Sequence, residues 1–325
     1  MVRLGFIGCG NHATQNLYPS LRYAPECELV AACDLHEERR EKVRRAYHPA
    51  HVYEHYDAML AAEKLDAVIV SGPPALHHAA GLAAMHAGLH VMTEKPPCNT
   101  LAEALEIQRV SRETGRICMV AFMKRFAQKY REAMEISARP EFGRRVHLLV
   151  RYSYGVQSNP HSILTAMAIH PIDLMRHFMG NVRSMQIEQG TLDRTCNYSI
   201  NMRFESGASG TLVINNTVPS PLEHLELAGD GTFIVVDEVA RLAYYPKTEK
   251  AWTQPKKWVS EPNTPLQTPE NDSLQLQGYA GEVQEFIEAV AVGRPPCCST
   301  IDDGVEAMRL AELIEKTGTG TCEVA

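Results

Sequence analysis

The sequence predicts a chain of two domains: a doubly wound α/β domain over residues 1–122, and an α+β domain with a mainly antiparallel sheet over residues 123–325. Short apolar runs alternate with helical segments through residue 121, which is typical of parallel strands joined by crossover helices. Beyond residue 145, strands of alternating polarity flank Gly-containing turns, as in antiparallel hairpins. A length of 325 residues is sufficient for two cores.

The first strand and the turn after it predict a dinucleotide site. Val2–Ile7 runs directly into a G-x-G-x-x-A motif. Its first glycine permits a tight turn, its second leaves room for a pyrophosphate, and the small Ala13 lets the next helix pack on the strand. The start of that helix offers N–H groups and the positive end of its dipole to phosphates. The residues expected to contact the cofactor here are Gly8, Cys9, Gly10, Asn11 and His12.

The second strand ends in an acid that bears on the choice of cofactor. Residues 28–33 are largely apolar, and Asp34 follows Ala13 by 21 residues. A carboxylate there accepts both ribose hydroxyls of NAD and repels a 2′-phosphate, so NAD is favoured. Arg39 and Arg40 follow closely and leave NADP open, unless they are solvated charges on the next helix.

Polar segments also follow the later strands of the first domain. Residues 67–70 run into Ser71-Gly72-Pro73-Pro74-Ala75-Leu76-His77, and residues 90–93 run into Glu94-Lys95-Pro96-Pro97. Ligands of doubly wound sheets bind at the carboxyl ends of the strands. Further cofactor contacts are therefore expected from Ser71, Pro73, His77, Glu94 and Lys95.

Together these motifs resemble the Gfo/Idh/MocA oxidoreductases, named for glucose–fructose oxidoreductase and inositol dehydrogenase. The resemblance implies an N-terminal Rossmann domain and a C-terminal domain with a large, open-faced sheet. That sheet would bind substrate on one side and a second subunit on the other, giving a homodimer or homotetramer. The resemblance also implies that Lys95 reaches the substrate beside the nicotinamide.

The chemistry of alcohol oxidation gives Lys95 a reason to lie there. An ammonium group near a hydroxyl stabilises the alkoxide as it forms and helps a neighbouring base to take the proton. The alternative is a surface lysine paired with Glu94. By similarity, the segment from Lys124 to Phe126 folds back over the cofactor, with Arg125 available to nicotinamide or substrate; the alternative is a basic linker that caps the sheet.

A second chemical stretch spans residues 166–177. Helical spacing puts His170, Asp173 and His177 close to one face. Members of the family commonly show D-x-G-x-H-x-x-D here; His170 and Asp173 match its last two positions, whereas Ala166 and Ala168 replace the first two. We therefore expect His170 to be the base, assisted by Lys95, with Asp173 fixing its ring. Asp173 is alternatively a helix carboxylate without a catalytic part, and His177 is expected to be a packed residue.

The leading interpretation is an NAD(P)-dependent dehydrogenase or reductase that acts on a CH–OH group of a sugar, cyclitol or related polyol. A polyhydroxy substrate needs several hydrogen-bonding side chains, and Arg125, Tyr152, Asn159, His161 and Asp173 are candidates, although His161 also fits a solvated loop. Two alternatives stay open: a non-catalytic dinucleotide-binding regulator, which Ala166 favours, and a dehydrogenase of a non-sugar ketone or cyclic diol.

Composition narrows the classes of partner. Formal net charge is −7, which argues against a nucleic-acid partner. Apolar runs stay well short of the roughly 18 residues of a membrane span, and a strand beginning at Val2 leaves no room for a signal peptide. Nine cysteines lack zinc-type spacing and indicate reduced thiols in a cytoplasm. No metal is expected, and residues 246–272, rich in Pro and polar residues, are expected to form a long surface excursion.

Overall fold

The structure is a computed structural model that describes residues 1–155, 163–193, 195–217, 222–248, 257–261 and 273–324. It contains two compact units. The first comprises Met1–Met123 and Gly278–Met308, and the second comprises Lys124–Gln277 and Arg309–Ala325. Sequence reasoning expected one boundary after residue 122, but the chain returns to the first unit. It does so because α10 (Tyr279–Val292) buries an apolar face against β1 and the short helices that follow β1.

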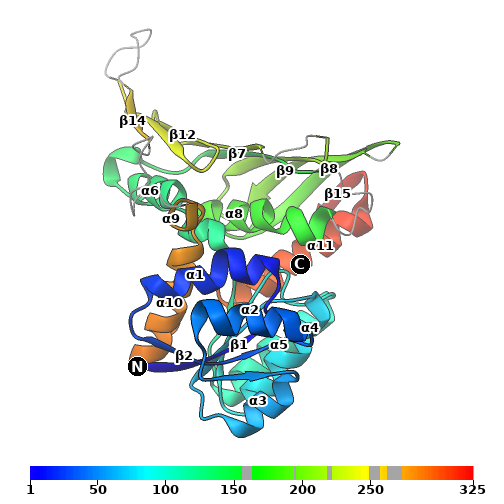
Figure 1. Ribbon diagram of the computed structural model, residues 1–325. Coiled ribbons are helices and arrows are strands. Elements are labelled where there is room, and N and C mark those ends of the chain that lie inside the picture. The colour runs from blue at the N-terminus through cyan, green and yellow to red at the C-terminus, as the bar shows by residue number, and fades with distance from the viewer. Residues whose placement is uncertain (156–162, 194, 218–221, 249–256, 262–272, 325) are drawn as a thin grey trace. The chain divides into compact units, whose positions relative to one another are not determined.

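The first unit is built on a six-stranded parallel sheet with the order β3-β2-β1-β4-β5-β6 (Figure 1). Its strands are β1 (Val2–Ile7), β2 (Cys27–Cys33), β3 (His51–Tyr53), β4 (Ala67–Val70), β5 (His90–Thr93) and β6 (Cys118–Val120). The chain leaves β1 toward β2 and later returns on the other side at β4. The carboxyl ends of β1 and β4 therefore form the switch point at which ligands bind in such sheets.

Helices cover both faces of this sheet, and its central strands are accordingly largely apolar. Every residue of β4 is buried. Thr100 and Glu103 form a reciprocal capping box at the start of α5, and Gly115 ends that helix with φ 65°. The helices of this unit are η1 (Ala13–Leu17), α1 (Tyr18–Ser20), η2 (Leu21–Tyr23), α2 (Glu37–Tyr47), α3 (Tyr56–Ala62), α4 (Pro74–His86), α5 (Leu101–Thr114), α10 and the first half of α11 (Ile301–Thr317).

The second unit is built on a nine-stranded sheet with the order β14-β13-β12-β11-β7-β10-β9-β8-β15. The β7–β10 pair is parallel and the other pairs are antiparallel, so the predicted α/β plus α+β class is confirmed. The strands are β7 (His147–Ser153), β8 (Val182–Leu192), β9 (Thr195–Phe204), β10 (Ser209–Asn215), β11 (Leu222–Ala228), β12 (Phe233–Asp237), β13 (Arg241–Tyr245), β14 (Trp258–Ser260) and β15 (Gly320–Glu323).

Helices pack on one face of this sheet. Along β9, buried Tyr198, Ile200 and Met202 alternate with the exposed Ser199 and Asn201. The buried side chains join a core with α6 and α8, and no helix of the described residues covers the opposite face (Figure 1). The helices are η3 (Met123–Phe126), α6 (Gln128–Ser137), η4 (Pro140–Phe142), η5 (Ile163–Met167), α8 (Ile169–Met179), α9 (Ser273–Gln277) and the second half of α11.

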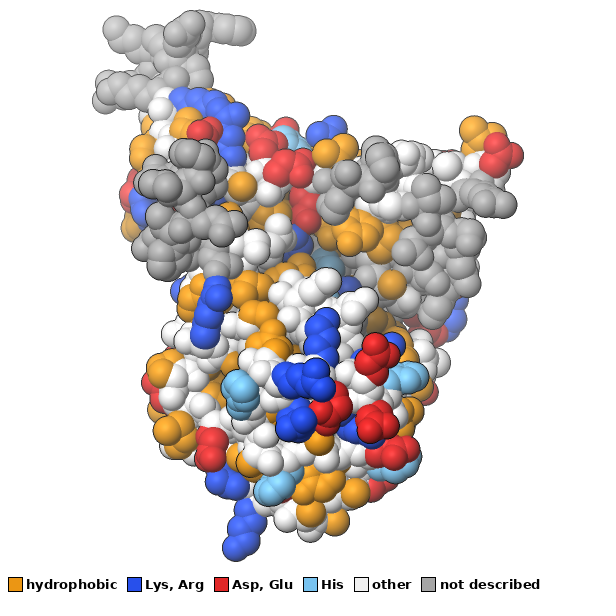
Figure 2. Space-filling view, viewed as in Figure 1, with side chains coloured by type: hydrophobic (Ala, Val, Ile, Leu, Met, Phe, Trp, Pro, Cys, Tyr) orange, Lys and Arg blue, Asp and Glu red, His pale blue; other side chains and the backbone are white. Residues whose placement is uncertain are grey.

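The surface excursion expected over residues 246–272 is only partly described. Within it, β14 extends the sheet by pairing with β13, so at least this part is not a plain loop. Residues 249–256 and 262–272 lie outside the described residues. On the face shown in Figure 2, Lys and Arg side chains lie next to Asp and Glu over α2. Among the described residues, no helix is both long and apolar enough to cross a membrane.

Candidate active site

The turn after β1 has the form that a dinucleotide requires. Gly8 has φ +107°, and a Cβ built on it would lie 1.8 Å from the carbonyl oxygen of Ser71, so the turn demands glycine. A Cβ on Gly10 would meet nothing within 4 Å. That open space lies where the helix of residues 11–20 begins, and the first N–H groups of a helix lack partners within it. The turn therefore fits a pyrophosphate.

Asp34 lies beside this turn at the end of β2. Its Oδ2 accepts a hydrogen bond from the Cys9 N–H at 2.8 Å, and its Oδ1 accepts one from the His36 N–H at 2.9 Å. The Cys9 side chain is buried next to Tyr18, and burial raises the pKa of this thiol to about 11. Cys9 thus contributes its backbone to the turn, whereas its thiol is a packing group.

Arg39 and Arg40, the residues that kept NADP as an alternative cofactor, lie close to Asp34. Arg39 Nη1 is 3.9 Å from Asp34 Oδ2, and half of the Arg39 side chain is exposed. Arg40 donates from Nη1 to the carbonyl oxygens of Asp34 at 2.7 Å and Leu35 at 3.1 Å. Arg40 therefore holds the loop after β2, and Arg39 lies next to the Asp34 carboxylate.

His12, Glu94 and Lys95 form a hydrogen-bonded cluster at the carboxyl edge of the sheet. Asn16 Nδ2 donates to His12 Nδ1 at 3.2 Å, so His12 Nε2 carries the proton and donates to Glu94 Oε1 at 2.7 Å. Glu94 Oε2 accepts from the Lys95 N–H at 3.0 Å. Burial alone would raise the pKa of Glu94, but the His12 hydrogen bond and nearby Lys95 outweigh it and lower the pKa. A buried carboxylate thus links the phosphate-binding turn to Lys95.

The start of α10 adds a residue that the sequence-based site omitted. Glu282 is fully buried, and neither of its carboxyl oxygens has a hydrogen-bond partner among the described residues. Burial, reinforced by Glu94, raises the pKa of Glu282 well above its ordinary value, although Lys95 opposes the shift. The surroundings of Glu282 therefore favour its neutral form over its charged form. Tyr279, one turn earlier, lies edge-on to the His12 ring at 5.7 Å. The signal available in the sequence was the Tyr-x-x-Glu spacing.

His77 joins the loops that follow β4 and β5 by hydrogen bonds to the backbone of each. Its Nδ1 donates to the Pro96 carbonyl oxygen, because that oxygen can only accept, at 2.8 Å. Its Nε2 accepts from the Gly72 N–H at 3.0 Å, and burial lowers the pKa of the ring. Both ring nitrogens are used by the protein, so His77 holds the loops after β4 and β5 rather than offering a nitrogen to a ligand. Ser71 and Pro73 belong to the first of these loops.

In the second unit, the two basic residues after β6 are engaged in buried ion pairs. Arg125 Nε and Nη2 donate to the two oxygens of Asp173 at 2.7 and 2.6 Å. Lys124 Nζ lies 2.6 Å from Glu223 Oε1. Arg125 and Asp173, both predicted to contact substrate, therefore hold each other and fix the N-terminal turn of α8.

His170 lies in that same first turn of α8 and is 5% exposed. Ala166, which replaces the acid of the family pattern, is exposed in η5 one turn before it. Tyr152 is buried near the end of β7, stacked on Tyr154 with ring centroids 6.2 Å apart. Asn159 and His161 lie outside the described residues. Lys95 and His170 belong to different units, so their joint action is part of the proposal below.

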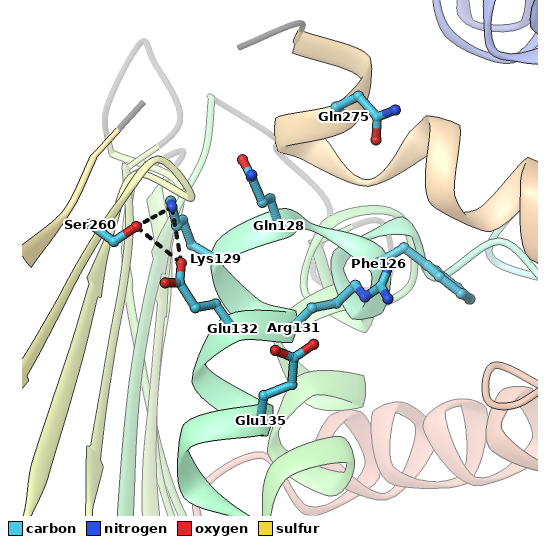
Figure 3. A pocket seen from close by; sticks show the side chains of 8 residues that line it. All are labelled: Phe126, Gln128, Lys129, Arg131, Glu132, Glu135, Ser260 and Gln275. Carbon is cyan, nitrogen blue, oxygen red and sulfur yellow. Dashed lines mark hydrogen bonds and ion pairs between the residues drawn. The ribbon is translucent and has the colours of Figure 1, made fainter. Parts of the chain in front are cut away.

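A cavity of about 600 Å³ lies beside α6 in the second unit (Figure 3). Lys129, Ser260 and Glu132 are joined by hydrogen bonds at one side of it. Neither His170 nor Tyr152 lines this cavity. Among the described residues, no cluster of three or more His, Cys, Asp or Glu side chains is placed to hold a metal ion.

Comparison with known proteins places the chain in a family. A model described as an oxidoreductase family with an NAD-binding Rossmann fold matches residues 2–122, and the model of that family's C-terminal alpha/beta domain matches residues 154–317. The chain belongs to the Gfo/Idh/MocA oxidoreductase family. It is thus an NAD-dependent oxidoreductase, and the predictions of family, enzyme class and cofactor are confirmed.

Relatives of similar length are dehydrogenases. The chain is 25% identical over 311 residues to 4-carboxy-2-hydroxymuconate-6-semialdehyde dehydrogenase of a Sphingobium strain, covering 91% of this chain and 92% of the relative. It is also 25% identical over 328 residues to scyllo-inositol 2-dehydrogenase (NAD(+)) of Bacillus subtilis, covering 92% and 88%.

Solved structures agree on the fold. A dehydrogenase from Chromobacterium violaceum has a TM-score of 0.90 and 28% identity, with 98% of this chain and 95% of that chain covered. Levoglucosan dehydrogenase in complex with NADH has a TM-score of 0.81 at 17% identity, with 100% and 99% covered, and supports the fold alone.

Replacing Asp34 is expected to change cofactor preference in this Gfo/Idh/MocA protein. In Asp34→Ala the ribose loses a charged acceptor, which is worth about 2 kcal/mol, so the Kd for NAD should rise roughly thirtyfold. NADP should lose less, because the carboxylate that repels its 2′-phosphate is gone and Arg39 stays nearby. Titration of both cofactors measures the ratio. Asp57→Ala, at an exposed acid on α3, is the control; equal losses for NAD and NADP would remove Asp34 as the selector.

Proposed function

We propose that this protein oxidises a secondary alcohol of a sugar, cyclitol or related polyol, with NAD as the hydride acceptor. The observation that carries the proposal is the His12–Glu94–Lys95 cluster, which attaches an ammonium-bearing residue to the turn that fits the pyrophosphate. When bound, NAD supplies an acceptor for the hydride of the carbinol carbon. The protein's own residues bind the alcohol and remove its hydroxyl proton.

Lys95 supplies positive charge where an alkoxide develops. The Glu94 carboxylate accepts hydrogen bonds from the Lys95 backbone N–H and from His12. These two bonds fix the backbone position from which the Lys95 side chain extends. Burial and the nearby Glu94 raise the pKa of Glu282 and so disfavour a second negative charge beside Glu94. Electrostatic stabilisation by a preorganised group is strongest in such a site, where water is excluded.

His170 supplies the base. It lies in the first turn of α8, whose neighbouring Asp173 is held by both Nε and Nη2 of Arg125. This pairing leaves Asp173 a positioning role, because its two oxygens already bind Arg125. In our proposal the C–H bond breaks with its electron pair going to the cofactor, the O–H proton goes to His170, and Lys95 stabilises the developing alkoxide.

A second candidate substrate class has its own support. The Sphingobium relative, named for a carboxylated semialdehyde, matches 91% of this chain. A carboxylated aldehyde is therefore the alternative to a polyol. An aldehyde has no hydroxyl proton, so Lys95 and His170 would act on its hydrate, whose C–H bond breaks with the electron pair going to the cofactor while its O–H proton goes to His170.

A substrate panel tests the proposal. Purified protein with NAD is mixed with sugars, sugar acids, inositols and the semialdehyde named for the Sphingobium relative, and the reduced-nicotinamide absorbance is followed. Turnover of a polyol supports the leading candidate, and turnover of the semialdehyde alone supports the alternative. NAD binding without turnover across the panel would contradict both and favour a cofactor-binding regulator, in keeping with Ala166.

His170→Asn is expected to lower kcat by about 10²- to 10⁴-fold, because it removes the base. The rise of the residual rate with pH should flatten, whereas the Kd for NAD should be unchanged. His147→Asn is the control, since His147 lies on β7 and bonds Ser209. A variant with full activity and an unaltered pH profile would exclude His170 as the base.

Location and assembly form part of the same proposal. All nine cysteines are free thiols, and Cys9, Cys33, Cys98, Cys118 and Cys196 are buried. This usage fits a reducing cytoplasm. The sheet face without helices suits a subunit contact, so we propose a homodimer or homotetramer, which sedimentation will measure.

A further inference from the structure

The second unit contains an open cavity of about 840 Å³ at the C-terminal end of α8. It is enclosed by the last turn of α8, the segment that leads into β7, and the turn between β9 and β10. The charged side chains among its described lining residues are all basic: Arg144, Arg145, Arg176 and His177. None of the residues assigned above to catalysis or to NAD binding belongs to it.

Arg145 has no acidic counterpart. Its Nη1 donates to the Phe178 carbonyl oxygen at 2.7 Å, whereas its Nε is buried and has no hydrogen-bond partner among the described residues. Arg145 is half-buried, and this partial loss of water lowers the pKa of its guanidinium. Neighbouring Arg144 is exposed and forms no ion pair with any described residue. Burying a cation without an anion beside it costs free energy. The binding of a negatively charged group next to Arg145 is therefore favoured.

The end of α8 does not supply enough negative charge to explain the cluster. A helix C-terminus is equivalent to about half an elementary charge. Basic residues in the last turn of a helix often serve only to compensate this partial negative charge. Three guanidinium groups at one cavity exceed what half a charge can compensate. One acid lies nearby: Asn181 Oδ1 accepts from Arg176 Nη2 at 3.1 Å, and Asn181 Nδ2 donates to Glu205 Oε2 at 3.3 Å. Glu205 is thus linked to Arg176 through Asn181, whereas Arg144 and Arg145 have no carboxylate partner among the described residues.

We propose that this cavity is a binding site for a compact oxyanion, a phosphate or carboxylate group of a small molecule. Guanidinium groups present parallel N–H donors that match two oxygens of such a group, and Arg145, which lines the cavity, has no carboxylate partner among the described residues. The site is additional to the oxidoreductase function and does not depend on which alcohol is the substrate.

Calorimetry on the full chain tests the site, with saturating NAD present so that the phosphate-binding turn after β1 is occupied. Inorganic phosphate and citrate are titrated separately. The anion with the lower Kd shows whether the site prefers a phosphate or a carboxylate group. We expect one saturable site per chain that weakens as salt is raised. Arg145→Met should weaken binding about tenfold or more, and Arg145→Lys, which keeps the charge, should weaken it less.

Because Arg145 also caps α8, Arg145→Met would lose binding if the variant failed to fold. Arg144→Met is a second test without this problem, since Arg144 is exposed and forms none of the hydrogen bonds described above. It should weaken binding severalfold with unchanged thermal stability. Arg151→Met, at an exposed arginine on β7, is the matched control and should leave binding intact. Absence of saturable binding to both anions, or unaltered affinity in both Arg144→Met and Arg145→Met, would overturn the proposal.

Discussion

Lys95→Met is expected to lower kcat/KM by about 10³-fold or more while leaving the Kd for NAD nearly unchanged. Methionine keeps the length and apolar stem of lysine but removes the charge that would stabilise an alkoxide. The Glu94 contact survives, because it is made by the backbone N–H of residue 95. Steady-state rates on the substrate found in the panel, together with a cofactor titration, measure the two quantities separately.

Lys42→Met on α2 provides the matched control, since Lys42 is exposed on the same unit. It should be fully active. Lys95→Arg should recover part of the lost rate, because the charge returns with a different shape. If Lys95→Met turns over like the natural protein, the lysine has no part in the chemistry. If it loses NAD binding to the same degree as turnover, Lys95 is a cofactor anchor instead.

Asp173→Ala is expected to destabilise the second unit by about 3–5 kcal/mol. Arg125 would keep its buried guanidinium and lose both carboxylate oxygens, now at 2.7 and 2.6 Å. Both residues are nearly inaccessible, Arg125 at 6% and Asp173 at 1% exposure, so water cannot replace the lost partner. Both tryptophans of the chain, Trp252 and Trp258, belong to this unit, so urea unfolding followed by their fluorescence reports its free energy of unfolding.

An exposed pair in the same unit supplies the comparison. Arg241 Nε and Glu261 Oε1 are 2.6 Å apart, but about half of each side chain is exposed. Glu261→Ala should therefore cost less than about 1 kcal/mol. The double variant Arg125→Met/Asp173→Leu should be more stable than Asp173→Ala, because no charge is left buried alone. A loss below about 1 kcal/mol in Asp173→Ala would show that the buried pair is not needed for stability.

Motifs that act over a few residues were predictable from the sequence. The strand, the G-x-G-x-x-A turn and Asp34 depend on local backbone geometry and on spacing along consecutive strands, and their placement at one edge follows from the parallel sheet. The hairpins of the second domain were predictable for the same reason, since polarity alternates with the pleat. Strand β8 and the edge strand β15 were not anticipated, because their pairing with each other is not signalled by either segment alone.

Contacts between distant segments changed the roles of several site residues. His77 was expected to contact the cofactor, but both ring nitrogens bind backbone atoms of the neighbouring loops. Arg125 and Asp173 are 48 positions apart and form an ion pair that no spacing rule indicates. Glu282 lies close enough to Glu94 to affect its charge because α10 belongs to the first unit, although most of the second unit precedes it in the chain.

By itself, therefore, the sequence determined the class of fold, the NAD-binding turn and the residue types available for moving a proton. These depend on backbone conformation and side-chain chemistry, which are properties of short segments. Tertiary packing settled which of those side chains bind one another, that Glu282 is buried, and where four basic residues line one cavity. Burial and partner choice depend on everything that packs around a group, and a linear pattern does not contain that information.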